Sequence, residues 1–281
     1  MIAPAKLNLC LYVGPRRDDG LHELCSLFVP LSLADRLNVS ETSGEADEVL
    51  CPGVDAPDLT ARALGSLREA GWRRAPLRIE VDKRIPVAAG LGGGSADAAA
   101  VLRLAADDFE PERLAALAAS LGADVTSQVD PRFALVSGVG ERVTPLPEPD
   151  PFAVVLVADP EGLSTAAVYA EADRLGSTRD ADELEHLRGE LLGVAAAGAS
   201  PLEYRELLVN DLSAAAISLR PSIREALADL TSAGAGHAFV TGSGPTAVGL
   251  FADAGAADPA AERLRDRHGR EGIVATSGMM R

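Results

Sequence analysis

RIPVAAGLGGGSADAAAV, residues 84–101, is the most informative segment of this chain. It holds four glycines between Gly90 and Gly94, and the alanines that follow favour a helix. Glycine lowers stability unless the backbone must turn sharply or approach another group closely. A glycine turn that leads into a helix presents N–H groups at the positive end of the helix dipole. The segment therefore predicts a phosphate-binding loop with Ser95 as the helix N-cap, and the alternative is a glycine turn made for close packing.

Composition narrows the class of protein. The chain has 281 residues, is 47% hydrophobic and carries a formal net charge of −16, so it can bury one large core or two moderate ones. The negative charge argues against nucleic acid or an anionic membrane as partner, because both require a basic face. There is no apolar run of membrane-spanning length or signal peptide in the sequence, and the three cysteines lack metal-ligand spacing. We expect a soluble cytoplasmic protein without a bound metal of its own.

Lysine is rare in this sequence. Among 26 basic residues, Lys6 and Lys83 are the two lysines. Lysine offers a compact point charge, whereas arginine offers a planar fork. A chain that uses arginine almost everywhere is expected to keep lysine where the compact ammonium is needed, although chance is the alternative.

Hydrophobic periodicity predicts mixed secondary structure. In the first part we expect these elements: strands at 5–13, 24–39 and 77–82, and helices at 58–71, from Ser95, and at 111–122. Past the proline-rich residues 144–151 we expect a strand at 154–159, a helix from Thr165, a polar stretch at 176–200, two helical segments separated at Pro221, two strands about a glycine turn at 237–252, and a last helix and strand. This order predicts an α+β fold with a domain boundary near Asp150, giving domains 1–150 and 151–281.

Three phosphate motifs compete for the glycine loop. A P-loop ends in Gly-Lys-Ser/Thr, whereas this loop ends in Gly94-Ser95-Ala96. A dinucleotide fingerprint spaces its glycines differently and needs an acid about twenty residues later, whereas Asp107 comes too early. The third is Pro-x-x-x-Gly-Leu-Gly-Gly-Gly-Ser at 86–95, which resembles the ATP loop of the GHMP small-molecule kinases.

Further segments extend this resemblance over nearly the whole chain. PAKLNL at 4–9 and TGSGPTAVGLF at 241–251 resemble the family's first and third motifs, and the third folds back toward the phosphate loop in that family. Within the GHMP kinases the resemblance narrows to the 4-diphosphocytidyl-2-C-methyl-D-erythritol kinase family, on these segments: RRDDGLHELCSLF, LGADV, GVGERVTPL and LVND. It implies an N-terminal ribosomal-protein-S5-like domain, a C-terminal ferredoxin-like α/β sandwich, and an active site in the cleft between them.

The resemblance also implies a reaction. ATP, with Mg²⁺, would phosphorylate the 2-hydroxyl of 4-diphosphocytidyl-2-C-methyl-D-erythritol in the non-mevalonate isoprenoid pathway. A tertiary alcohol is a poor nucleophile, so a carboxylate should take its proton while a cation restrains the developing charge. Asp124 and Lys6 match the family's catalytic Asp and Lys. Because Lys6 lies in a strand that otherwise faces a core, it needs a partner, and we expect that partner to be Asp124.

Binding residues are implied in three groups. For ATP they are Lys83 and the loop residues Pro86, Val87, Ala88, Ala89, Gly90, Leu91, Gly92, Gly93, Gly94, Ser95 and Ala96. For the substrate they are Asn8, His22, Thr165 and Tyr169. Near the phosphates they are Gly242, Ser243 and Gly244. In the family the residue matching His22 contacts cytosine, and the aromatic matching Tyr169 stacks on the base.

The sequence departs from the family pattern at several positions: Leu21 replaces a Tyr, Asp58 an adenine-contacting Asn, Ala88 and Ala89 glycines, Ala96 a second loop Ser, and Thr126, Ser127 and Gln128 a Pro and Phe segment. The alternatives are another GHMP kinase of the homoserine or mevalonate type, a non-catalytic nucleotide-binding relative, and a Rossmann reductase.

Overall fold

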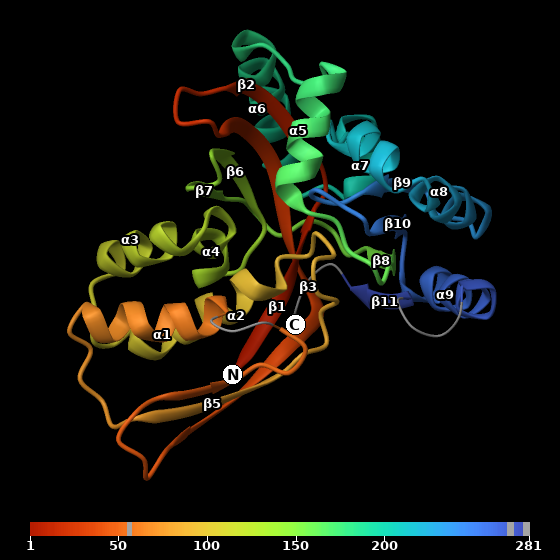
Figure 1. The fold of residues 1–281 in the computed structure, drawn as a ribbon. Helices are drawn as coiled ribbons and strands as arrows, with labels where there is room; N and C mark the ends of the chain where they lie inside the picture. The colour runs from red at the N-terminus through yellow and green to blue at the C-terminus, as the bar shows by residue number, and fades with distance from the viewer. Residues whose placement is uncertain (55–57, 269–272, 278–281) are drawn as a thin grey trace.

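The computed structural model describes residues 1–54, 58–268 and 273–277. The fold is α+β, as predicted, with two sheets packed together and helices on their outer faces (Figure 1). The first sheet has the order β4-β5-β3-β6-β7, with β1 and β2 also paired to β3, and the second has the order β11-β8-β10-β9. Most neighbouring strands are antiparallel, and the pair β4 and β5 is parallel.

The elements of the first part are β1 (Ile2–Asn8), β2 (Tyr12–Arg16), β3 (His22–Glu41), β4 (Glu48–Leu50), α1 (Leu59–Glu69), β5 (Leu77–Asp82), α2 (Gly93–Leu102), a 3₁₀ turn (Arg103–Ala105), α3 (Pro111–Leu121), α4 (Ala123–Val129), β6 (Ala134–Gly138) and β7 (Arg142–Pro145). Those of the second are β8 (Ala153–Val157), α5 (Thr165–Leu175), α6 (Ala181–Ala195), a 3₁₀ helix (Pro201–Leu207), α7 (Ser213–Leu219), α8 (Ser222–Ser232), β9 (His237–Val240), β10 (Ala247–Phe251), α9 (Ala254–His268) and β11 (Ile273–Ser277). We propose that the domain boundary lies near Asp150, between β7 and β8.

The predicted strand at 5–13 is interrupted. β1 ends at Asn8 and β2 begins at Tyr12, because the Leu11 N–H turns away to donate to the Val209 carbonyl at 2.8 Å. Leu7 and Leu9 therefore pack in the core between the sheets, whereas Leu11 and Val13 pack in a separate cluster with α5 and α7. The prediction of one continuous strand at 5–13 was wrong.

Two helix starts also differ from the prediction. α2 begins at Gly93, with Gly92 as its N-cap at φ 68°, so Ser95 lies inside the first turn and caps nothing. Glycine tolerates this left-handed conformation, which lets the helix start two residues early. Asp124, which follows the end of the predicted helix at 111–122, lies in the first turn of a further helix, α4, which begins directly after Gly122 ends α3. Within the polar stretch 176–200, α6 forms with Asp180 as its N-cap.

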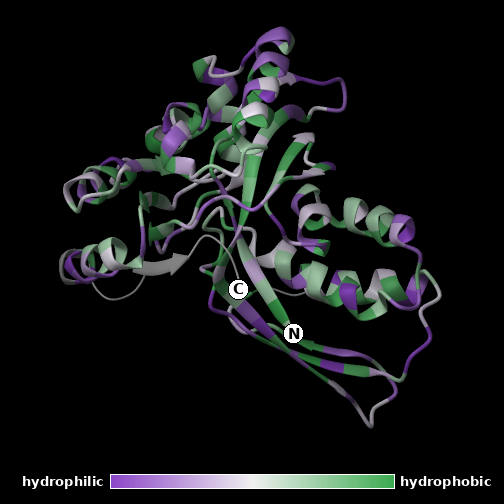
Figure 2. Ribbon diagram, turned by 180° about the vertical axis from the view of Figure 1, so that it is seen from behind, coloured by the Kyte–Doolittle hydropathy of each residue, from purple (hydrophilic) through white to green (hydrophobic). Residues whose placement is uncertain are grey.

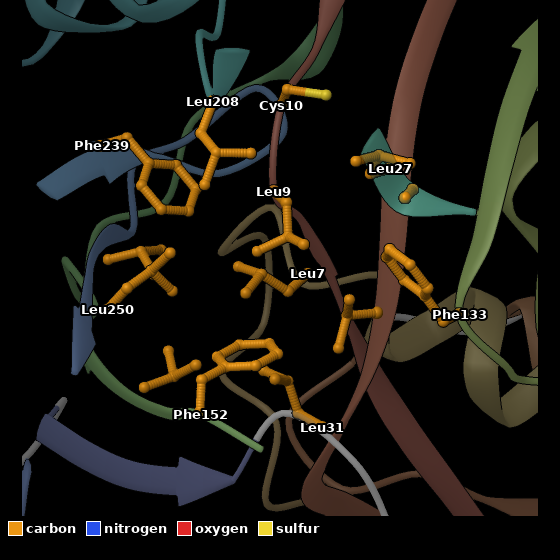
Figure 3. Close-up of a cluster of buried hydrophobic side chains, with 14 of the residues drawn as sticks. Leu7, Leu9, Cys10, Leu27, Leu31, Phe133, Phe152, Leu208, Phe239 and Leu250 are labelled. Atoms are coloured by element: carbon orange, nitrogen blue, oxygen red, sulfur yellow. The ribbon is translucent and has the colours of Figure 1, made fainter. Parts of the chain in front are cut away.

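A hydrophobic core joins the two sheets. Leu7, Leu27 and Leu31 of the first sheet, together with Leu9 just past the end of β1, face Phe152 and Leu250 from the second part of the chain (Figure 3). The opposite face of the first sheet is covered by α1, α2, α3 and α4, where the alanines of α2 pack closely. Hydrophobic residues concentrate in the central strands and polar ones on the outer helices (Figure 2). Among the described helices, none has the length and apolar character needed to cross a membrane.

Candidate active site

A cavity of about 1250 Å³ lies where the phosphate loop, β1, α5 and the turn after β9 meet. It is lined by almost every residue that the sequence predicted for a site: Lys6, Asn8, His22, Lys83, Pro86 to Ser95, Asp124, Thr165, Tyr169, Gly242 and Ser243. The structure does not place Ala96 or Gly244 at the wall. The Ala96 side chain is buried in the core and its N–H donates to the Gly92 carbonyl, so neither group is available to a ligand.

The phosphate loop supplies N–H donors. The first hydrogen bond of α2 runs from Ala96 N–H to Gly92 O at 2.9 Å. The N–H groups of Gly93, Gly94 and Ser95 come before it and have no partner within the helix. All three residues line the cavity, so this helix end offers a set of donors suited to an anion.

Close packing applies to the same loop. A Cβ on Gly90 would lie 2.8 Å from the Thr241 carbonyl oxygen, and one on Gly92 would lie 2.8 Å from Lys6 Cγ. Both glycines have positive φ, at 76° and 68°. Phosphate binding and close packing therefore both account for the glycines. The glycines let the loop pack closely against β1 and the third motif, and this packing directs the start of α2 into the cavity.

Lys6 and Asp124 meet beside this helix end. Lys6 Nζ lies 3.5 Å from Asp124 Oδ2, so the predicted pairing is present. Lys6 Nζ also donates to Asn8 Oδ1, and Asn8 Nδ2 in turn donates to Ser26 Oγ at 2.8 Å. The Lys6 side chain is 8% exposed and that of Asp124 is 37% exposed. The ammonium is thus held in place by its neighbours, while the carboxylate keeps an open side toward the cavity.

Lys83 has a different environment, which the sequence did not predict. Its Nζ donates to Asp35 Oδ2 at 2.5 Å and to Asp97 Oδ2 at 2.7 Å. Asp35 is fully buried, and its Oδ1 accepts the N–H groups of Arg84 and Ile85. Burial raises the pKa of Asp97 to about 7, against the opposing charge of Lys83. This cluster ties β3, the start of the phosphate loop and α2 together.

His22 and Tyr169 lie at another part of the wall. The two rings are 5.3 Å apart and tilted by 30°, and His22 Nε2 lies 2.8 Å from Asp173 Oδ1. Burial raises the pKa of Tyr169 to about 12, and the charge of Asp124 adds to the effect. Leu21 lines the cavity as well and is 53% exposed. Sequence reasoning missed Asp173, although its position four residues after Tyr169 puts both on one face of a helix.

The third motif is fixed by side chains from elsewhere in the chain. Thr165 Oγ1 and Ser243 Oγ are hydrogen-bonded at 2.9 Å. Asn210 Nδ2 donates to the carbonyls of Val240 and Gly242, at 2.7 and 2.8 Å. Asn210 belongs to the LVND segment, to which the sequence assigned no role. Its function in the fold is to hold the glycine turn against the phosphate loop.

The departures from the family pattern have structural counterparts. Asp58 is the N-cap of α1, where its Oδ1 accepts the Ala61 N–H at 2.8 Å. Gln128 is buried and donates to the Pro4 carbonyl, so the altered stretch after Asp124 packs against β1. Ala88, at a position where the family has glycine, has a φ of 54°, in the left-handed region that favours glycine.

Within the described parts of the chain, there is no group of three or more His, Cys, Asp or Glu side chains arranged to hold a metal ion.

Comparison with known proteins gives consistent matches. The chain matches the family described as GHMP kinases N terminal domain over residues 58–138, and GHMP kinases C terminal over residues 184–270. A 4-diphosphocytidyl-2-C-methyl-D-erythritol kinase of Nocardia farcinica is 39% identical, over 98% of this chain and 92% of the relative. One of Mycolicibacterium gilvum is 41% identical, over 90% of this chain and 82% of the relative.

Solved structures agree with these matches. A 4-(cytidine 5'-diphospho)-2C-methyl-D-erythritol kinase is 36% identical, with a TM-score of 0.80, covering 100% of this chain and 99% of that one. Mevalonate kinase of L. major, at 17% identity, has a TM-score of 0.71 and covers 99% of this chain and 95% of its own. The second likeness concerns the fold alone.

Proposed function

The chain belongs to the 4-diphosphocytidyl-2-C-methyl-D-erythritol kinase family of the GHMP kinases, and we propose that it transfers the γ-phosphate of ATP to the 2-hydroxyl of 4-diphosphocytidyl-2-C-methyl-D-erythritol. This reaction supplies a precursor for isoprenoids by the non-mevalonate pathway. The proposal is supported most directly by the Lys6 and Asp124 pair at 3.5 Å, in one cavity with the N–H groups at the start of α2. Relatives at about 40% identity carry this activity in their names.

The pair suits the chemistry of the transfer. Asp124 accepts the proton of the substrate 2-hydroxyl. The hydroxyl oxygen forms the new bond to the γ-phosphorus of ATP, and the bond from that phosphorus to the bridging oxygen of the ADP leaving group breaks. Lys6 stabilises the charge that develops on the transferring group. The fixed geometry of Lys6 through Asn8 means that little reorganisation is needed at this step.

The loop residues hold the phosphates. The N–H groups of Gly93, Gly94 and Ser95 bind phosphate oxygens, and the third motif at Gly242 and Ser243 closes the other side of the site. The substrate cytosine lies near His22 and Tyr169. Ala96 and Gly244, which do not line the cavity, contribute through packing.

Mg²⁺ accompanies ATP in this proposal. Ser95 and Asp124 line the cavity together with the start of α2, and the Ser95 hydroxyl and the Asp124 carboxylate would be the oxygen ligands that the chain supplies. This donor set fits Mg²⁺, which binds proteins through one or two side chains and takes its other ligands from phosphates and water. When bound, the ion neutralises phosphate charge.

We also propose a cytoplasmic location, supported by the free thiols of Cys10, Cys25 and Cys51, which suit a reducing compartment.

A substrate panel tests the proposal. The purified chain is incubated with ATP and, separately, 4-diphosphocytidyl-2-C-methyl-D-erythritol, homoserine, mevalonate and galactose. We expect phosphorylation of the first compound, detected as its phosphorylated product by mass spectrometry. Transfer to one of the others instead would assign a different GHMP kinase activity. ATP binding by calorimetry, without transfer to any of the four, would indicate a non-catalytic relative.

A further inference from the structure

A carboxylate on α5 holds the histidine of the substrate side. Asp173 Oδ1 lies 2.8 Å from His22 Nε2, and the side chains are 37% and 5% exposed. Both residues line the cavity with Tyr169. Asp173 has no part in the phosphate transfer described above, so its contact with His22 calls for an explanation of its own.

The contact determines which ring nitrogen carries a proton. An ionised carboxylate only accepts hydrogen bonds, so Nε2 must be the donor in this pair. In a neutral imidazole, the other nitrogen then has a lone pair and no proton. In residues 1–54, 58–268 and 273–277, no partner is found for His22 Nδ1. In the neutral ring, Nδ1 is therefore an acceptor that a bound ligand can use.

The ring is also restrained in orientation. Tyr169 packs against His22 with a centroid distance of 5.3 Å, and it lies one helical turn before Asp173 on α5. One helix thus supplies both the packing surface and the hydrogen bond. The direction of the Nδ1 lone pair is fixed before any substrate enters.

We infer that Asp173 is a positioning residue that keeps the proton on His22 Nε2, so that Nδ1 accepts a hydrogen bond from the exocyclic amino group of cytosine and rejects uracil. This inference rests on the proposed function and deepens it. Cytosine carries an N4 amino donor at the position where uracil has a carbonyl oxygen. An acceptor facing that carbonyl leaves both lone pairs without a donor, which is costly in a buried site.

Binding and turnover test the inference together. We compare CDP with UDP by calorimetry, and the cytidine substrate with its uridine analogue by kcat/KM. The wild type should prefer cytosine in both, and Asp173→Ala should lower that preference about tenfold or more, with the KM for ATP unchanged. Asp18→Ala, which removes an exposed acid from the loop between β2 and β3, is the control and should keep the preference. An unchanged preference in Asp173→Ala would overturn the inference.

Nitrogen-15 NMR of the imidazole supplies a readout that loss of packing alone would not move. The wild type should show a proton on His22 Nε2 and none on Nδ1, and a protonated Nδ1 would overturn the inference. In Asp173→Asn the amide can accept from Nε2 or donate to it, and the cytosine preference must follow whichever nitrogen NMR finds protonated. If the wild type phosphorylates neither nucleotide substrate, the proposed function fails, while CDP against UDP binding and the NMR pattern still decide the role of Asp173.

Discussion

The two lysines of this chain line the same cavity in opposite electrostatic settings. Lys83 is held between Asp35 and Asp97, at 2.5 and 2.7 Å, and both acids are essentially buried. Among the described residues, Lys6 is paired with one acid, Asp124, at 3.5 Å, and that acid is 37% exposed. With both carboxyl groups ionised, the first cluster has more negative than positive charge, whereas the second is balanced.

The different surroundings of the two lysines indicate a structural role for Lys83 and a catalytic role for Lys6. An anion that approached Lys83 would meet two carboxylates that already use its donors, whereas Lys6 can turn part of its charge toward a phosphate. We therefore propose that Lys83 supports the nucleotide mainly by anchoring the loop, and that Lys6 acts on the transferring group. The rarity of lysine in the sequence indicated both Lys6 and Lys83, but the number of acidic partners around each lysine distinguishes their roles.

The largest effect is expected at the balanced pair. Asp124→Asn and Lys6→Ala should each lower kcat by about 10²–10⁴, with ATP affinity largely unchanged, because proton acceptance and charge stabilisation are lost while the loop N–H groups remain. Steady-state kinetics with calorimetric ATP binding measures this. Asp130→Asn, at the other end of α4, is the matched control and should be close to wild type. Near-normal turnover in Asp124→Asn would remove the assigned base.

The next effect concerns stability. Lys83→Met should lower the free energy of unfolding by about 3–5 kcal/mol, because it leaves two buried carboxylates without a cation. Lys6→Met should cost clearly less, since Asp124 can be hydrated on its open side. Urea denaturation of both variants gives the comparison. Equal losses would mean that the two lysines are equally structural.

A pH series examines the excess negative charge at Lys83. The pKa of Asp97 is about 7 in the folded chain and near 3.8 when it is unfolded. Between these values the folded state binds more protons, so this group makes the protein less stable as pH rises. Asp97→Asn should lack this loss, and its stability relative to wild type should increase from pH 5 to pH 8 in urea denaturation.

The control for this series is Asp108→Asn. Hydrogen bonds from Trp72 and Arg74 lower the pKa of Asp108 below its ordinary value, so its contribution is lost only in more acidic solution. Its stability difference from wild type should stay flat from pH 5 to pH 8. A flat difference for Asp97→Asn as well would contradict the raised pKa.

The smallest expected effects are those of alanine substitutions at Gly92, which packs against Lys6, and at Gly93, which lies near Lys83. A Cβ on Gly92 would lie 2.8 Å from Lys6 Cγ, whereas one on Gly93 would lie 3.3 Å from Lys83 Nζ and 3.0 Å from Ile85. Gly92→Ala also places a side chain at φ 68°, so we expect a stability loss of about 1 kcal/mol together with a lower kcat. Gly93→Ala, at a helical position, should change kcat less. Thermal unfolding and initial rates measure the stability and the kcat of both variants. A larger loss in Gly93→Ala than in Gly92→Ala would contradict the contacts described for these two glycines.

The parts of the fold that follow local patterns were predictable. The helix at α1, the strand β5 and the glycine loop each show in periodicity or composition, and the pairing of Lys6 with Asp124 followed from motifs matched to a family. The Asp35 and Lys83 contact joins residues 48 positions apart, and no local pattern reports it. Asp97 lies within an alanine-rich helix, where an acid is ordinarily solvated, so its burial depends on tertiary packing.

Other errors have similar physical causes. The start of α2 moved because Gly92 adopts the left-handed conformation, which glycine tolerates, and packs closely against the Lys6 side chain. α4 was missed because its Val and Thr residues are weak helix formers, and packing against β1 through Gln128 stabilises it. The interruption after Asn8 depends on Leu11 bonding to Val209, about two hundred positions away in the sequence. Such long-range contacts override local periodicity.

The contact between the phosphate loop and the third motif limits how this protein can evolve. A Cβ at Gly90 meets the carbonyl of Thr241, and one at Gly242 meets the carbonyl of Gly90 at 2.9 Å. Each obstacle is main chain, which every amino acid carries, so trimming a neighbouring side chain cannot make room. Lineages that lose either glycine have reversion as their route back, and a suppressor screen begun from Gly90→Ala should return glycine codons at position 90.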